Sequence, residues 1–348
     1  MTPHSSTIPV EVIFNPNWWF RNYGISFDES FYLGTDQRIN NDVAMRRALH
    51  ERFGIGEANP QPRPIIGSQH IAGGFVLPAL LGVEIRFSQQ EAAWPVPINL
   101  TREKILALRV PDLQTTWPMN RLIADMDALE KRFGQVIGDF NTAGVFNTAL
   151  ELRGQQLFMD LLDDEDMVKH LFAVVAETEA ALAEYVRART GTSSVAVNRS
   201  ILNVNPRIHI EGNCSGQMIS PAVYRRCLLP WHSYLAQRLA PFGIHHCGDN
   251  LHIFGSAYAE THAVFYDVGW GSDVARCSAD LPDAFLNLRL NPVRLLHCTA
   301  EEARNDALAL LRAAGRESHV GLCCINMDYA TPDENVGAIL AAAGEFQL

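Results

Sequence analysis

Short β-like stretches and helix-like stretches alternate through the second half of the chain. The β-like stretches cover residues 201–210, 243–247, 263–268, 285–290 and 320–327. Helical patterns follow them from about residue 220 and over residues 250–260, 272–279, 300–314 and 331–343. Parallel strands need a crossover connection, usually a helix, between them. The order therefore predicts βαβ units of about 30 residues and a parallel sheet.

The first half shows the same scheme less regularly. Residues 11–14 and 136–140 are strand candidates, and residues 164–189 form a long helical block. Counting the units gives roughly eight strands, which predicts an α/β protein built as a single (β/α)8 TIM barrel over residues 1–348, with an N-terminal extension. A doubly wound open sheet is the alternative. It is weakened because no Gly-rich nucleotide-binding fingerprint follows any strand pattern.

Charge and cysteine usage exclude several classes of protein. The 28 Lys and Arg residues against 39 Asp and Glu residues give a net charge of −11, which disfavours nucleic acid or an anionic membrane as partner. No secretory signal pattern and no run of about 18 apolar residues is visible. The seven Cys residues all lie between Cys214 and Cys324, and their odd number and wide spacing do not form a disulfide framework. We therefore expect a reducing, cytoplasmic compartment.

The segment from residue 243 to residue 249 carries the sharpest local signal. It reads Gly-Ile-His-His-Cys-Gly-Asp at the end of a predicted strand, so His245 and Cys247, two residues apart, face the same side. Imidazole nitrogen and thiolate sulfur are ligands that suit Zn²⁺, and active sites of barrel enzymes lie at this end of the strands. The pair alone is a weak signal, because a packed His beside a buried Cys gives the same pattern.

Two further thiols strengthen the prediction of a metal site. Cys323 and Cys324 lie in the last predicted strand, where neighbours point to opposite faces, so only one of them can look into the barrel mouth. A His-Cys-Cys set with an open fourth position is a catalytic arrangement of zinc. Asp267, on an intervening strand, is predicted as an oxygen ligand or as a hydrogen-bond acceptor behind the ligands. Its alternative is a helix-capping or surface carboxylate.

Other residues receive less specific predictions. Cys214, Cys277 and Cys298 are interpreted as structural thiols, with Cys214 in a Gly/Ser turn. Asp139, Asn141 and Arg207 lie near predicted strand ends and are predicted to orient a substrate. The aromatic residues between 18 and 23 are predicted either to line an apolar pocket or to seal the floor of the barrel.

These motifs resemble those of a known group of proteins. Residues 211–221, 229–232 and 245–248 give a Gly-rich turn, a Met-x-Ser-Pro helix start and a His-x-Cys-Gly strand end. A Cys then precedes Thr-Pro-x-x-Asn at residues 331–335. In this the chain resembles the uroporphyrinogen decarboxylase superfamily, and within it the corrinoid-dependent methyltransferases.

The first half resembles the decarboxylase itself more distantly. Residues 73–84 look like the segment that carries the decarboxylase's key Asp, but Gly73 stands at that place. Residues 19–24 resemble its Arg-rich motif, with Ile25 in place of the second Arg. A porphyrinogen with four acid groups needs cationic partners, which this chain lacks at these positions. The resemblance therefore favours methyl transfer over decarboxylation.

The resemblance implies a barrel with Zn²⁺ held by His245, Cys247 and Cys324, with Cys323 as the alternative to Cys324. It also implies a corrinoid carried by a separate partner protein, because no Asp-x-His-x-x-Gly pattern occurs in this chain. The methyl group would move from a small methylated substrate to cobalt, or from methyl-cobalt to a thiol. The number of aromatic residues favours a methoxylated aromatic substrate. A metal-independent decarboxylase and a non-catalytic corrinoid-protein partner or tetrapyrrole carrier are the competing hypotheses.

Overall fold

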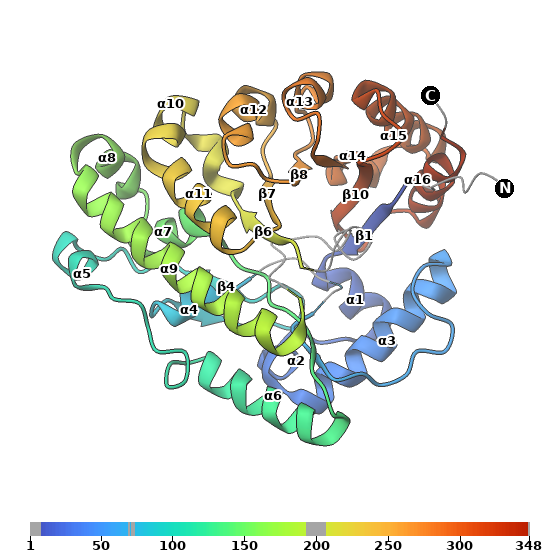
Figure 1. Cartoon of the computed structure of the whole chain (residues 1–348). Coiled ribbons are helices and arrows are strands. Elements are labelled where there is room, and N and C mark those ends of the chain that lie inside the picture. Colours follow the sequence, from blue (N-terminus) through green and yellow to red (C-terminus); the bar gives the residue numbers. More distant parts are fainter. Residues whose placement is uncertain (1–7, 69, 71–73, 193–206, 347–348) are drawn as a thin grey trace.

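A computed structural model describes residues 8–68, 70, 74–192 and 207–346 of the protein. Its main sheet has six strands, all parallel, in the order β1-β10-β9-β8-β7-β6. The strands are β1 (Val10–Phe14), β6 (His209–Gly212), β7 (Phe242–His246), β8 (Phe265–Val268), β9 (Phe285–Arg289) and β10 (Val320–Met327). This sheet curls into an incomplete barrel, with helices along its outer side (Figure 1).

Two smaller sheets accompany the main one. β2 (Ile65–Ile66) pairs in parallel with β5 (Ile137–Gly138), and β3 (Glu84–Arg86) pairs antiparallel with β4 (Trp94–Val96). The loop after β5 packs against the end of β6, because a Cβ added at Gly144 would lie 2.1 Å from the carbonyl oxygen of Gly212. The α/β class and the parallel sheet predicted from the sequence are confirmed. A closed eight-stranded barrel stays a prediction.

The helices fall into two groups along the chain. Those before β6 are α1 (Pro16–Tyr23), α2 (Glu29–Leu33), α3 (Thr35–Phe53), α4 (Val76–Leu80), α5 (Arg102–Ala107), α6 (Met119–Phe133), α7 (Val145–Arg153), α8 (Gln156–Asp163) and α9 (Glu165–Thr190). Those after β6 are α10 (Pro221–Val223), α11 (Leu229–Arg238), α12 (Leu251–Ala259), α13 (Val274–Asp280), α14 (Pro292–His297), α15 (Ala300–Ala314) and α16 (Asp333–Glu345). A 3-10 helix (Cys214–Met218) follows β6, and a π-helical turn (Tyr224–Leu228) joins α10 to α11.

Local sequence signals explain where several of these helices begin. Ser220 accepts a hydrogen bond from the Val223 backbone, and Pro221 occupies the first turn of α10, where its missing N–H costs nothing. Thr299 and Glu302 form a complete capping box at the start of α15. These signals correspond to the helix starts predicted from the sequence.

Most strands of the second half lie within a residue or two of the predicted ranges. The exception is the prediction at residues 201–210, of which residues 201–206 lie outside the described part of the chain, and β6 covers the rest. The sequence did not predict β2, which has two residues, or the hairpin of β3 and β4. The predicted helix at 164–189 corresponds to α9.

The two faces of the main sheet have different partners. Alternate residues such as Ile244, Leu286 and Leu322 pack outward in the large apolar core shared with the helices. The inner face begins with an apolar layer, Ile208, Ile210, Phe265 and Phe285, near the amino ends of the strands. Beyond this layer the inner face becomes polar and is still buried, so the sheet delivers polar side chains to its carboxyl-terminal edge.

The aromatic residues near the amino end of the chain are mostly core residues. Trp18 and Trp19 are buried, and the Trp18 ring stacks on Phe14 of β1 with centroids 3.9 Å apart. Tyr23 is exposed. Among the described helices, none combines the length and the apolar character that crossing a bilayer requires.

Candidate metal centre

Three metal-ligating side chains meet at the carboxyl-terminal edge of the main sheet. They are Cys214, His245 and Cys247, and one ligand atom from each lies within 4.8 Å of the others. His245 is fully buried, whereas both Cys residues are partly buried. One nitrogen and two sulfurs from three side chains match the catalytic class of zinc site, which leaves a coordination position open.

The strand register brings Cys214 to the His-x-Cys motif. β6 pairs in parallel with β7, so Gly212 lies opposite His245, and the Asn213 backbone N–H donates to the His245 carbonyl at 2.9 Å. The 3-10 helix then starts at Cys214 and turns its thiol toward Cys247. The sequence had assigned Cys214 to a structural turn. The end-of-strand position on the neighbour of β7 was the signal that could have identified it.

A tyrosine hydroxyl of α12 contacts the ends of both β6 and β7, next to the metal-ligating residues. Tyr258 of α12 accepts a hydrogen bond from the Asn213 side chain at 2.8 Å and lies 2.7 Å from Nδ1 of His246. The other ring nitrogen of His246 lies 2.8 Å from Oδ1 of Asn250, and burial lowers the pKa of this His to about 4. His246 is therefore a neutral packing residue that faces away from its neighbours in the motif.

The imidazole of His245 is held by a chain of side chains on adjacent strands. Its Nδ1 lies 2.7 Å from Oδ2 of Asp267 on β8, and the Asn287 amide on β9 donates to Oδ1 of Asp267 at 2.8 Å. All three side chains are buried. A His that donates one ring N–H to a carboxylate keeps its other nitrogen deprotonated for a metal. Asp267 thus has the geometry of the acceptor behind a ligand, one of its two predicted roles.

The surroundings of Nε2, the second ring nitrogen of His245, show whether the group fits a metal. Within the described residues, Nε2 is buried without an oxygen or nitrogen partner, and the Cys247 sulfur is its polar neighbour. A nitrogen and a thiolate sulfur that face each other are a donor pair that a zinc ion between them would bind. The residues present therefore fit a zinc ion.

Arg289 of β9 places a positive charge beside the metal-ligating group. It is buried, and its Nη1 donates to Sγ of Cys247 at 2.9 Å. A hydrogen bond from the Cys214 thiol, together with the nearby His245 and Arg289, lowers the pKa of Cys247 far below its ordinary value. The adjacent Cys247, followed by burial, raises the pKa of Cys214 well above the ordinary value. Cys247 is therefore the intrinsic thiolate of the group, and metals bind thiolates.

The two C-terminal thiols face opposite sides of β10, and neither joins this group. Cys324 packs in the large core shared with the helices, whereas Cys323 packs with Ile13 and Ile325 on the other face of β10. Cys323 is paired in register with Arg289, and burial raises its pKa well above the ordinary value. Among the described residues, neither Cys323 nor Cys324 belongs to a group of metal-ligating atoms.

Two of the residues predicted to orient substrate lie in different places. Arg207 is exposed in the turn before β6, at the opposite end of that strand from Cys214. Its backbone carbonyl accepts a hydrogen bond from Arg187 at 3.0 Å. Asn141 follows β5 and is buried at the edge where the metal-ligating residues lie. The structure therefore brings Asn141 to the predicted end of the sheet and leaves Arg207 away from it.

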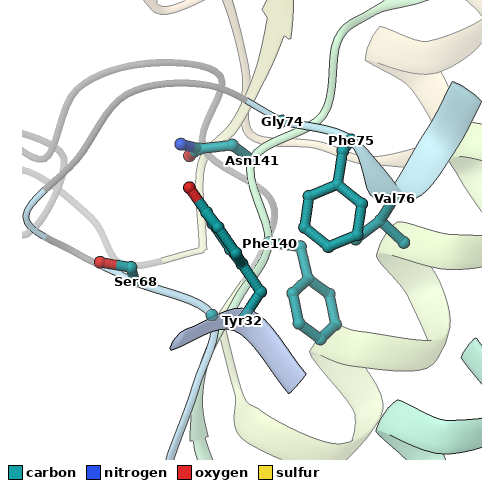
Figure 2. A pocket seen from close by; sticks show the side chains of 8 residues that line it. Tyr32, Ser68, Gly74, Phe75, Val76, Phe140 and Asn141 are labelled. Carbon is teal, nitrogen blue, oxygen red and sulfur yellow. The ribbon is translucent and has the colours of Figure 1, made fainter. Parts of the chain in front are cut away.

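Asn141 lines a small cavity of about 30 Å³ with aromatic walls. Figure 2 shows the rings of Tyr32, Phe75 and Phe140 around it, and the Tyr32 hydroxyl beside the Asn141 amide. The backbone N–H of Ala93 donates to that hydroxyl at 3.0 Å. Burial raises the pKa of Tyr32, so its hydroxyl stays neutral. Its apolar walls and few polar groups have the composition of a small-molecule site, but its volume in this structure is that of about two water molecules.

Comparisons with known proteins support the fold. No protein-family model matches the chain, and no curated protein matches it either. Among solved structures, a methyltransferase from Methanosarcina mazei is similar, with a TM-score of 0.66 over 98% of this chain and 94% of that chain. The two sequences are 16% identical. At that identity the likeness shows a shared fold.

Proposed function

We propose that the protein is a zinc-dependent methyltransferase that exchanges a methyl group between a small methylated substrate and the corrinoid of a partner protein. The observation that carries the proposal is the group of Cys214, His245 and Cys247 at the carboxyl-terminal edge of the sheet. A methyltransferase of the same fold and the sequence motifs shared with corrinoid-dependent methyltransferases support the reaction class.

The proposed zinc ligands are His245, Cys247 and Cys214. The resemblance alone favoured Cys324 or Cys323 as the third ligand, and the geometry favours Cys214. Zinc in such a site supplies a Lewis acid for the oxygen of a methyl donor, or keeps an acceptor thiol ionised. Either role needs an open coordination position, which three protein ligands provide.

The surrounding residues have separate tasks in this proposal. Asp267 and Asn287 hold the His245 ring so that Nε2 faces the metal. Arg289 donates to the Cys247 sulfur and balances the negative charge of the thiolates. The hydrogen bond also withdraws electron density from Cys247, which makes the ligand itself a poorer methyl acceptor.

We assign the aromatic walls beside Asn141 to the substrate, which can enter only when the side chains around this small cavity move apart. Flat rings from Tyr32, Phe75 and Phe140 suit an aromatic compound, and the Asn141 amide suits a polar substituent on it (Figure 2). A methoxylated aromatic donor satisfies both features. The corrinoid comes from a separate protein, since this chain has no pattern for binding one.

Zinc content tests the ligand set directly. Cys214→Ser is expected to lower zinc affinity by at least about 10-fold, because one of three protein ligands is lost. Cys323→Ala and Cys324→Ala are matched controls that remove a thiol of β10 and keep the metal. The proposed set of zinc ligands is wrong if Cys323→Ala or Cys324→Ala loses the zinc while Cys214→Ser retains it at wild-type affinity.

Methyl transfer tests the reaction. Purified protein is mixed with Co(I) cobalamin and a panel of methoxylated aromatic acids, and the corrinoid spectrum reports methylation. We expect turnover with wild type and loss of it in Cys247→Ser. Decarboxylation of a cyclic carboxylate without zinc would instead support the decarboxylase hypothesis, and a protein that binds a corrinoid partner without any turnover would support the carrier hypothesis.

A further inference from the structure

Two thiols of the candidate metal centre lie next to each other. The sulfurs of Cys214 and Cys247 are within 4.8 Å, and a hydrogen bond from the Cys214 thiol reaches the Cys247 sulfur. Both side chains are partly exposed, whereas four of the other five cysteines are buried. A thiol that is open to solvent and has a second thiol beside it can be oxidised to a disulfide.

The backbone around each thiol accounts for this proximity. Gly212 of β6 lies opposite His245 of β7, and Cys214 and Cys247 each follow two residues later. Neighbouring strands are about 4.8 Å apart, which is inside the range of about 4.4–6.8 Å that a disulfide needs between its Cα atoms. Rotation of the two side chains can therefore bring the sulfurs to bonding distance without moving either strand.

Hydrogen bonds on both sides of Cys214 hold its turn in place. The Asn213 side-chain amide donates to the Tyr258 hydroxyl at 2.8 Å. The Ser215 backbone N–H donates to Oδ1 of Asn147 at 2.9 Å. A thiol fixed beside its partner reacts as an intramolecular group, so disulfide formation is faster than between two free thiols.

The two thiols have different tasks in this reaction. Nη1 of Arg289 lies 2.9 Å from the Cys247 sulfur, and a neighbouring cation favours the thiolate, which is the form that attacks an oxidant. Cys214 donates its hydrogen bond to that thiolate and keeps its own proton. Cys247 is thus the attacking sulfur, and Cys214 is the sulfur that closes the disulfide.

We infer that Cys214 and Cys247 form a site of reversible oxidation, where a peroxide converts the two thiols to a disulfide. The Cys247 thiolate bonds to one peroxide oxygen, the O–O bond breaks, and hydroxide or alkoxide leaves. The Cys214 sulfur then bonds to the sulfur of the resulting sulfenic acid. The S–O bond breaks, and the leaving hydroxide takes the Cys214 proton to form water. Two electrons pass from the sulfurs to the peroxide, and a small thiol reverses the change by disulfide exchange.

The consequence for the metal rests on the proposed function. Zinc binds thiolates, and a disulfide has none. Oxidation therefore removes two of the three proposed zinc ligands and leaves His245 alone, so the ion is released as Zn²⁺ and methyl transfer stops. Disulfides in reducing compartments are mostly transient and redox-sensing, which agrees with the compartment expected from the cysteine usage.

Peptide mapping of the wild-type protein tests the site without any substitution. The protein is titrated with hydrogen peroxide, its remaining thiols are alkylated, and tryptic peptides are identified by mass spectrometry. Trypsin cuts at Arg225 and Arg238, between the two cysteines. We expect one cross-linked pair of peptides that contains Cys214 and Cys247, with a mass lower by two hydrogens, and its loss after reduction. A fluorescent chelator should detect about one zinc ion released per disulfide formed.

Two variants serve as controls. Cys298→Ser removes a partly exposed thiol at the end of α14 and should leave the cross-link and the zinc release unchanged. Cys214→Ser should accumulate sulfinic acid at Cys247, because the sulfenic acid then has no second thiol beside it.

The outcomes separate this inference from the proposed function. Oxidised wild type in which Cys214 and Cys247 stay unlinked overturns the oxidation site, whether or not the protein holds zinc and transfers methyl groups. A cross-link in protein that was never exposed to chelator and holds no zinc supports the oxidation site and contradicts the proposed function.

Discussion

The orientation of one imidazole decides the chemistry of the candidate centre. His245 can present Nε2 to a metal only while Nδ1 carries its proton, and the Asp267 carboxylate enforces that tautomer at 2.7 Å. Asn287 donates to the other oxygen of Asp267, so the carboxylate itself cannot rotate freely. The three hydrogen-bonded side chains His245, Asp267 and Asn287 come from three neighbouring strands, β7, β8 and β9.

Asp267→Asn tests the importance of that orientation. The amide has the same shape but can present N–H to Nδ1, which would move the proton of His245 to the metal-facing nitrogen. We expect zinc affinity to fall about 10- to 100-fold, as for other carboxylates behind a metal-ligating His. Competition with a fluorescent zinc chelator measures the change.

Asp283→Asn is the control, because Asp283 is an exposed residue of the turn before β9. It should leave zinc affinity unchanged. Equal affinity in Asp267→Asn and wild type would show that Asp267 does not orient a ligand.

The sequence predicted only part of this residue set, for a physical reason. His245 and Cys247 were identifiable because strand periodicity puts them on one face within a single motif. Cys214, Asn287 and Arg289 come from other strands, and their relation to the motif depends on the register of β6, β7 and β9. Each strand end can be located from the sequence, but which of these ends lie side by side depends on strand order and register, which local patterns specify only in part.

At the scale of elements, the position of the candidate ligand Cys214 depends on one contact. The loop that follows β5 packs there against the end of β6. Gly144, with φ of +80°, allows the loop to approach the last residue of β6 closely. An added Cβ would lie 2.1 Å from the Gly212 carbonyl oxygen and 2.8 Å from Oε1 of Glu211. Gly212 is two residues before Cys214, so a shift at this contact moves the thiol.

Gly144→Ala is therefore expected to destabilise the protein by about 3 kcal/mol or more and to weaken zinc binding. Urea unfolding and the chelator competition measure the two effects. Gly134→Ala is a matched control, since Gly134 has φ of +78° and no atom within 4 Å of an added Cβ. That control should cost about 1–2 kcal/mol through backbone strain alone and leave zinc affinity unchanged. Similar losses in both variants would mean that the close approach at Gly144 has no special role.

Element length explains which parts of the fold were predictable. The strands β7 to β10 are continuous buried runs bounded by turn residues, and such runs are visible in the sequence. β2 has two residues, which is too short for any periodic pattern, whereas β5 lies within the strand predicted at residues 136–140, of which it covers two residues. Tertiary contacts therefore determine much of the first half, and the number of its strands could not be predicted reliably from the sequence.

At the scale of the whole molecule, a buried ion-pair network anchors the first half. Asp42 of α3 accepts hydrogen bonds from Arg46 at 2.9 Å and from Arg63, which precedes β2, at 2.7 and 2.8 Å. Arg38, on the same helix, donates to the carbonyl of Ile65 in β2 at 2.8 Å. The network thus ties α3 to the two-stranded parallel sheet.

The charge on Asp42 makes this anchor sensitive to acid. Burial alone favours the protonated carboxyl, but His70 and Arg63 outweigh it and hold the pKa of Asp42 well below the ordinary value. A carboxyl whose folded-state pKa is lowered stabilises the fold above its unfolded pKa of about 3.9, and loses that contribution as the pH falls further. The stabilisation is therefore complete at neutral pH and declines below about pH 4.

Asp42→Asn should cost about 3 kcal/mol of unfolding free energy at neutral pH, because it removes the anion of Arg63 and one of the two carboxylate partners of the buried Arg46. The difference from wild type should shrink below about pH 4, as the wild-type carboxyl loses its advantage. Urea unfolding across this pH range measures both. Asp36→Asn on the same helix removes an exposed partner of Arg132 and should change stability by less than about 1 kcal/mol at any pH. A difference between Asp42→Asn and wild type that stays constant with pH would mean that the Asp42 charge does not anchor α3 to the sheet.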